Sequence, residues 1–285
     1  MNKTLISFGH GYVAQALGQA LLADGWQVFG TTRDAARADA LAKTGVTPLL
    51  WSDAGAIRAA LGQASHLLAS AAPGPLGEPV LADFGPAISR AARQLHWAGY
   101  LSTTGVYGDH QGGWVDETTA LAPSTARGKA RVAAEAEWQA IKDLPLHIFR
   151  LAGIYGPGRG PFAKLRAGTA QRIVKPGQVF SRIHRDDIVQ VLRASMAHPN
   201  PGRIYNLCDD DPAPPQDVIG HAAQLLGLPM PPEIAFDQAD LGPMARSFYA
   251  ESKRVCNARI KQELGVALAY PTYKQGLAAL LAAGE

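Results

Sequence analysis

The sequence has few of the residues that mark secreted, fibrous or nucleic-acid-binding proteins. Only two cysteines occur in 285 residues, Cys208 and Cys256, and their spacing matches neither a metal site nor a redox motif. Such scarcity is typical of a chain that folds in a reducing compartment. Charged residues make up 18% of the chain, the formal net charge is only +3, and no basic run occurs. The composition therefore indicates no nucleic-acid partner.

Long uninterrupted apolar runs are also missing. Residues 59–77 carry no Asp, Glu, Lys or Arg, but Pro73, Pro75 and three glycines interrupt them. A membrane-spanning helix is excluded there, and we expect no membrane partner. The first residues enter an apolar segment directly, without a signal-peptide pattern. We therefore expect a soluble, cytoplasmic protein.

Apolar segments of strand length alternate with helical segments along the first half of the chain. Strands are expected at 4–8, 26–32, 47–51 and 66–70. This alternation predicts an α/β fold, a Rossmann doubly wound parallel sheet with right-handed crossovers. A small, mainly helical C-terminal part would bind the substrate.

The expected domains interleave along the chain. Residues 1–158 would form the dinucleotide-binding Rossmann domain, and 179–208 would return to it, with strands near 179–184 and 203–207. Residues 159–178 and 209–285 would form the smaller substrate-binding part.

A glycine-rich turn links the first strand to the first helix. It has the pattern G-x-G-x-x-A, between an apolar strand and an amphipathic helix. In a βαβ unit the glycines allow a tight turn and close approach of the backbone to a pyrophosphate, which the helix N-terminus also attracts. The alternative is a plain strand–turn–helix connection. The candidate cofactor-binding residues here are Gly9, His10, Gly11, Tyr12 and Val13.

The end of the second strand indicates which dinucleotide is bound. An acidic residue roughly 20 positions past the glycines would hold the ribose hydroxyls of NAD. Arg33 stands there instead, after Thr31 and Thr32. A guanidinium beside hydroxyls suits a 2′-phosphate, so NADP is preferred and NAD is the second choice. The alternative is a surface Arg33 beside an Asp34 that caps the next helix.

Two further segments are candidates for contact with the cofactor. Asp53 follows the third strand, where it would reach the adenine amino group or merely cap the next helix. Ala71 and Ala72 follow the fourth strand, and their small side chains would let a cofactor lie flat.

Four later motifs occur in an order that resembles a known family. They are Ser102–Asp109 (STTGVYGD), Arg150–Gly158 (RLAGIYGPG), Arg182–Ile188 (RIHRDDI) and Tyr205–Leu207 (YNL). This order resembles the extended short-chain dehydrogenase/reductases, the NAD(P)-dependent epimerases and dehydratases, over about residues 1–210. The resemblance adds Ser102, Leu151 and Ala152 to the candidate cofactor-binding residues.

The resemblance fails at the catalytic pair. Family members carry a Tyr and a Lys four residues apart on the helix after the fifth strand, where the Tyr acts as acid and base. In this sequence the matching positions are Arg127 and Arg131. Arginine cannot donate a proton near neutral pH, but two guanidiniums on one helix face can hold a carboxylate or phosphate. The alternative is a solvated basic face paired with Glu135.

The remaining catalytic candidates come from the fifth-strand motif. Thr103 matches the family residue that hydrogen-bonds the reacting oxygen, and Tyr107 or a bound water would be the fallback proton source. Tyr107, Tyr155 and Tyr205 are otherwise expected to pack beneath the site, and Cys208 to behave as a small buried hydrophobe.

These observations predict an altered member of the family. We expect an NADP(H)-dependent oxidoreductase or epimerase/dehydratase-like enzyme acting on a small, anionic substrate molecule. The rival is a non-catalytic NAD(P)-binding sensor or scaffold. No metal site is expected, because an isolated H-x-D-D at 184–187 is typical of capping. The basic segment 252–254 would meet the substrate, and the helices near 86–95 and 126–141 would form a homodimer.

Overall fold

The computed structural model describes residues 3–285, which form two compact units. The first unit contains the described residues up to Thr103, with Lys129–Arg150 and Val191–Tyr205. The second contains Thr104–Gly128, Leu151–Gln190 and Asn206–Glu285. The chain therefore passes between the units several times.

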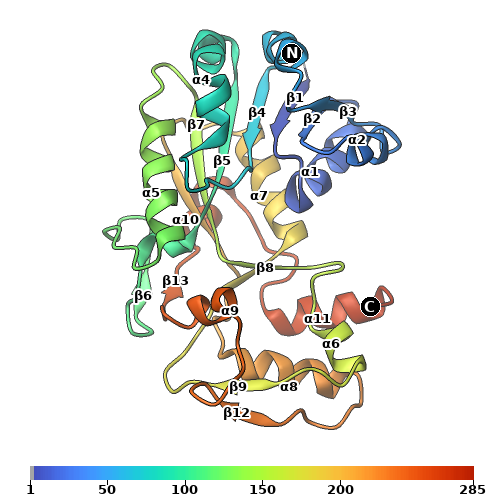
Figure 1. Cartoon of the computed structure of the whole chain (residues 1–285), viewed down its shortest axis with the longest axis vertical. Coiled ribbons are helices and arrows are strands. Elements are labelled where there is room, and N and C mark those ends of the chain that lie inside the picture. Colours follow the sequence, from blue (N-terminus) through green and yellow to red (C-terminus); the bar gives the residue numbers. More distant parts are fainter. Residues whose placement is uncertain (1–2) are drawn as a thin grey trace. The chain divides into compact units, whose positions relative to one another are not determined.

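The first unit opens with a regular alternation of strands and helices (Figure 1). Its elements are β1 (Thr4–Phe8), α1 (Tyr12–Ala23), β2 (Gln27–Thr32), α2 (Ala35–Ala42), β3 (Thr47–Leu50), α3 (Ala54–Gln63), β4 (His66–Ala69), α4 (Pro79–Ala91), η1 (Ala92–Gln94) and β5 (Trp97–Thr103). Four further elements begin in one unit and end in the other. They are α5 (Ala126–Gln139), β7 (Leu146–Leu151), α7 (Arg185–Ala197) and β11 (Ile204–Leu207).

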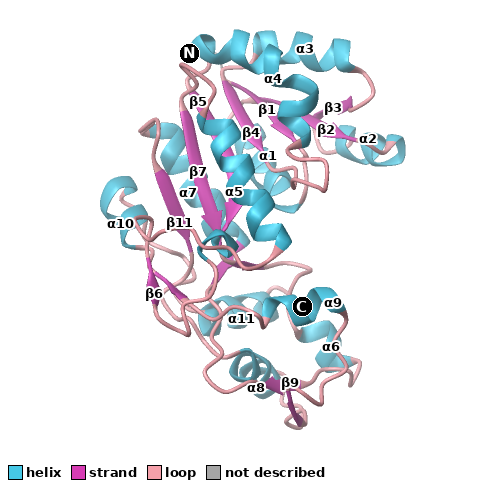
Figure 2. Ribbon diagram, turned by 60° about the vertical axis from the view of Figure 1, so that its left-hand side comes forward, coloured by secondary structure: helices cyan, strands magenta, loops and turns pink. Residues whose placement is uncertain are grey.

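Seven strands form the central sheet, in the order β11-β7-β5-β4-β1-β2-β3 (Figure 2). The pairs β1–β2, β1–β4, β2–β3 and β4–β5 are all parallel. The strand order reverses between β1 and β4, which is where doubly wound sheets bind ligands at their carboxyl edge. The predicted Rossmann sheet is confirmed.

Helices cover both faces of this sheet, and the sequence of β5 shows why. Successive side chains of a strand point to opposite faces. Ala98 and Tyr100 join the apolar cluster that α3, α4 and α5 complete. Trp97 lies on the other face, where its Nε1 donates to Ser195 Oγ of α7 at 3.0 Å. Strands buried on both faces need apolar residues throughout, and all five residues of β1 are buried.

The second unit is built from short elements. They are η2 (Thr104–Tyr107), β6 (Trp114–Val115), β8 (Gly153–Tyr155), α6 (Phe162–Arg166), β9 (Arg172–Val174), β10 (Arg182–His184), α8 (Pro215–Leu225), β12 (Glu233–Ala235), α9 (Pro243–Phe248), β13 (Arg254–Val255), α10 (Ala258–Leu264) and α11 (Tyr273–Ala282). An apolar cluster formed largely by α6, α8 and α11 is the core of this unit, and three two-stranded ladders complete it.

The two strands predicted to return to the sheet have different outcomes. The strand near 203–207 is confirmed, because β11 is the edge strand beside β7. The prediction for 179–184 is wrong, because β10 pairs with β8 in a separate parallel ladder. Only Ala152 separates β7 from β8, so the chain leaves the large sheet at this residue, and β10 pairs with β8 outside that sheet. Within residues 3–285, no helix combines the length and apolarity needed to cross a bilayer.

Candidate functional site

The glycine-rich turn has the geometry that a pyrophosphate site requires. Gly9 has φ of +75°, and a Cβ there would lie 2.8 Å from the Ala71 backbone nitrogen, so only glycine fits. Its N–H donates to Thr31 Oγ1 at 2.8 Å. A Cβ on Gly11 would meet only the Gly9 carbonyl oxygen, at 3.6 Å, so space lies open beside the start of α1. This open, glycine-lined helix start fits a dinucleotide phosphate.

His10 lies beneath this turn. Its side chain is 3% exposed, and its ring is so close to β2 that a Cβ on Gly30 would lie 2.8 Å from Cγ. Burial lowers the pKa of His10 to about 4, so the ring is neutral at pH 7. The His10 N–H donates to Thr31 O at 3.1 Å. The side chain therefore packs between α1 and β2, where Gly18 and Gly30 leave room for it.

The two aspartates after the second and third strands both cap helices. Asp34 accepts from Ala36 N at 2.9 Å, and Asp53 accepts from Ala56 N at 2.9 Å. The capping interpretations of both are confirmed, and an adenine contact by Asp53 stays a prediction. Arg33 is exposed beside buried Thr32 and is sterically available to a phosphate.

The loop after β4 is tied to the glycine turn by a residue that the sequence did not single out. Ser70 Oγ donates to the Gly9 carbonyl at 2.5 Å. The next residue, Ala71, is half-buried against Gly9, and Ala72 is exposed. Small side chains are needed here because Ala71 already lies in contact with the turn.

A buried charged network lies behind the fifth-strand motif. Ser102 Oγ donates to Glu135 Oε1 at 2.5 Å, and Arg150 Nη2 donates to Glu135 Oε2 at 2.7 Å. The three residues are 2–4% exposed. The predicted alternative, in which Glu135 pairs with a solvated basic face, is wrong: Glu135 turns inward because Arg150 is its buried partner.

Arg131 also turns toward the sheet. Its Nη1 donates to Tyr100 Oη at 2.9 Å and to the Leu101 carbonyl at 2.7 Å, and the side chain is half-buried. Glu78, 2% exposed, caps α4 through Leu81 N at 2.7 Å. Burial raises the pKa of Glu78, and the positive charge of Arg131 opposes that rise. Arg131 therefore supplies a fixed positive charge at the carboxyl end of β5.

The two other catalytic candidates differ in exposure. Thr103 ends β5 and is half-buried. Tyr107 is fully buried, and its hydroxyl donates to Asn206 Oδ1 at 2.7 Å. The packing interpretation of Tyr107 is confirmed, and its role as a fallback proton source stays a prediction. Tyr155 and Tyr205 are buried as well, at 8% and 0% exposed.

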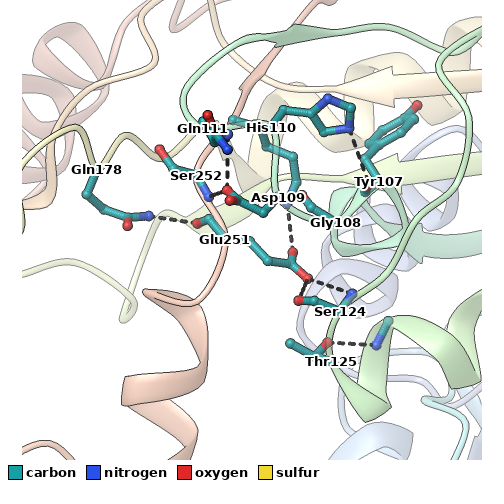
Figure 3. A network of polar contacts seen from close by, with 12 residues as sticks. Tyr107, Gly108, Asp109, His110, Gln111, Ser124, Thr125, Gln178, Glu251 and Ser252 are labelled. Carbon is teal, nitrogen blue, oxygen red and sulfur yellow. Dashed lines mark hydrogen bonds and ion pairs between the residues drawn. The ribbon is translucent and has the colours of Figure 1, made fainter.

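The basic segment 252–254 is anchored by hydrogen bonds within the second unit. Lys253, 9% exposed, donates to the Gly108 carbonyl at 2.6 Å and pairs with Glu251 at 2.8 Å. Ser252 N donates to Asp109 Oδ1 at 2.7 Å, as Figure 3 shows. These contacts hold the segment to the loop after η2, and its predicted contact with the substrate stays a prediction.

The remaining motif residues of the second unit are also internal. Leu151 and Ala152 are buried, and Ala152 N donates to Leu207 O at 3.0 Å. Asp187 accepts from Ala269 N at 2.7 Å and Tyr270 N at 3.1 Å, so it fastens a distant loop. Cys208 is fully buried, as predicted. Among the described residues, no cluster of three or more His, Cys, Asp or Glu side chains is arranged to hold a metal ion.

Comparison with known proteins agrees with this geometry. No model of a protein family matches the chain. Protein YeeZ of Escherichia coli is 30% identical, over 94% of this chain and 97% of its own length. A solved structure of a conserved protein of unknown function from Silicibacter pomeroyi is 59% identical, with a TM-score of 0.94 and 99% of each chain covered.

A further solved structure carries a family description. A protein from Methylobacillus flagellatus, described as an NAD-dependent epimerase/dehydratase, is 27% identical and has a TM-score of 0.73, with 99% of this chain and 98% of that chain covered. The chain belongs to the family of YeeZ, and the solved structures that it resembles include NAD(P)-dependent epimerase/dehydratases. The resemblance inferred from the four motifs is confirmed. At the level of fold alone, the chain also matches MoeE5 in complex with UDP-glucose and NAD, at 18% identity and a TM-score of 0.78, with 98% of this chain and 97% of that chain covered.

Proposed function

We propose that this family member is an NADP(H)-dependent oxidoreductase that acts on a small anionic substrate. The observation that carries the proposal is the position of Arg131. Its guanidinium is held by Tyr100 and the Leu101 carbonyl at the carboxyl end of β5, the edge at which doubly wound sheets bind ligands. A permanent cation there suits a substrate with negative charge, or one that develops it during reaction.

The residues that would hold the cofactor lie around the glycine turn. The N–H groups at the start of α1 and the open space at Gly11 would receive the pyrophosphate. Arg33, exposed after β2, would pair with the 2′-phosphate. When bound, the nicotinamide supplies or accepts a hydride.

The chain's own residues would then act on the substrate oxygen. In the reducing direction, the substrate's carbonyl oxygen would develop negative charge as its carbon is reduced. Thr103 would hydrogen-bond that oxygen, and the Arg131 charge would stabilise it. Because the family tyrosine is replaced and Tyr107 is buried, the balancing proton would come from water.

The cofactor preference gives a direct test. Wild-type protein should bind NADPH more tightly than NADH, and Arg33→Ala should weaken NADPH binding by about 1.5–3 kcal/mol, the range for hydrogen bonds to charged groups. Titration of NADPH fluorescence measures both affinities. Arg58→Ala, which removes an exposed cation from α3, is the matched control and should leave the affinity unchanged. Equal affinity of the wild type for NADPH and NADH would refute the assignment of Arg33.

A second candidate function is a cofactor-binding sensor without turnover. It is favoured by the burial of Tyr107, which leaves no protein acid among the predicted catalytic residues. NADPH oxidation across a panel of carbonyl substrates separates the two functions. Turnover that Thr103→Ala abolishes supports the enzyme. Tight NADPH binding without oxidation of any member supports the sensor.

A further inference from the structure

The residue that replaces the family tyrosine makes an unexpected contact within the second unit. The guanidinium carbon of Arg127 lies 5.0 Å from the ring centroid of Phe248 on α9. Both side chains are exposed, and 52% of Phe248 faces solvent. Within residues 3–285, Arg127 forms no ion pair with a carboxylate. An exposed cation on an exposed aromatic ring therefore still has its charge available to an anion.

The helix that carries Phe248 exposes its apolar side chains. No residue of α9 is buried, and Met244 is 68% exposed. Met244 and Phe248 are four residues apart, so they share one face of the helix. Large apolar side chains that cluster at the surface usually mark a contact site, because solvent exposure of such a cluster is unfavourable.

Polar anchors rather than burial hold this helix in place. Lys175 Nζ donates to the Tyr249 carbonyl, and the Tyr249 ring stacks on Phe236 with centroids 5.0 Å apart. Just beyond, Glu251 accepts from Ser124 Oγ at 2.6 Å, which ties the segment to the residues before α5 (Figure 3). The position of Phe248 near Arg127 is thus maintained by contacts that do not involve either side chain.

We propose that Arg127, Phe248 and Met244 form a recognition surface for a planar aromatic anion. The ring of the ligand would pack on Phe248 and Met244, and its carboxylate or phosphate would pair with Arg127. An aliphatic anion would lose the ring contact, and a neutral aromatic would lose the ion pair. The inference goes beyond the proposed function, because the surface lies wholly within the second unit and its ligand need not be the substrate.

Isothermal titration calorimetry of the full chain tests the surface without turnover. The probes are cinnamate, UDP, 3-cyclohexylpropionate and cinnamamide. At least one of the two aromatic anions should bind, and the saturated anion and the neutral amide should each bind about tenfold more weakly. Which of cinnamate and UDP binds separates an aromatic carboxylate from a nucleotide.

Two variants should reduce the affinity for the aromatic anion by about tenfold each, Phe248→Ala and Arg127→Met. Both side chains are exposed, so both variants should retain the fold. A further variant, Phe248→Leu, removes the aromatic ring but keeps apolar area, so it separates the effects of these two losses. Trp114→Ala, which removes an exposed aromatic of β6, should change the affinity less than twofold. The inference is overturned if neither aromatic anion binds, if the saturated anion binds as tightly, or if both variants keep wild-type affinity. NADPH titration run in parallel tests the proposed function separately, because its failure leaves these affinities unaffected.

Discussion

Removal of the Glu135 carboxylate should strongly destabilise the protein. Glu135 accepts from Ser102 Oγ and from Nε and Nη2 of Arg150, at 2.5, 3.1 and 2.7 Å. Both charged side chains are 3% exposed, so Glu135→Ala would leave the Arg150 cation without its buried partner. Breaking a buried pair in this way costs about 3–5 kcal/mol, much more than the net contribution of the intact pair.

Urea unfolding followed by circular dichroism measures this cost, as a lower midpoint with an unchanged slope. Glu137→Ala is the matched control, because Glu137 is an exposed carboxylate on the same helix and should cost about 0.5 kcal/mol or less. The double variant Glu135→Leu with Arg150→Met removes both charges and should recover most of the lost stability. If Glu135→Ala and Glu137→Ala unfold at the same urea concentration, or if the double variant is less stable than Glu135→Ala, the ion-pair argument is wrong.

Three further predictions follow from other parts of the structure. Burial raises the pKa of Asp209 from 3.8 to about 8, so the free energy of unfolding should fall as pH rises from 4 to 8 and stay constant above pH 8. Asp209→Asn should flatten this slope in thermal melts at several pH values and add about 1–3 kcal/mol of stability at pH 9. An unchanged slope would contradict this prediction. Gly9→Ala should cost about 1–3 kcal/mol of stability and abolish NADPH binding, measured by melting with and without NADPH; unchanged melting and binding would exclude strain at this turn. A homodimer through α4 and α5 should scatter light at twice the 30.1 kDa chain mass at micromolar concentration, and a monomer mass would overturn it.

The sheet could be predicted because its signals are local in sequence. The strand at 4–8 has the predicted bounds, and the helix after Asp34 begins where that capping residue predicts, because an apolar run and a capping side chain are both local signals. The helix expected near 86–95 instead occupies Pro79–Ala91, where Glu78 caps it through Leu81 N. Pro86, expected at the start of this helix, lies in its interior.

The charged residues could not be assigned in the same way. The sequence pattern does not show that Lys253 donates to the Gly108 carbonyl, which lies 145 positions away in the sequence. The sequence offers Glu135 as a surface partner of nearby arginines, but its partner is Arg150 on β7. The residues next to a charged side chain in the sequence do not reveal which distant segment will bury it. The hydrogen-bond partner of such a side chain is therefore known only from the folded structure.

The sequence by itself determined the glycine turn and the alternation of strands and helices, because each depends on residue types at short, fixed spacings. Only the tertiary structure decided that His10 packs inside, that β10 leaves the large sheet, and that Arg127 meets Phe248. These outcomes depend on which distant segments fill the space around a residue. Long-range packing therefore determines which arginines remain available to a ligand and which hold the fold together.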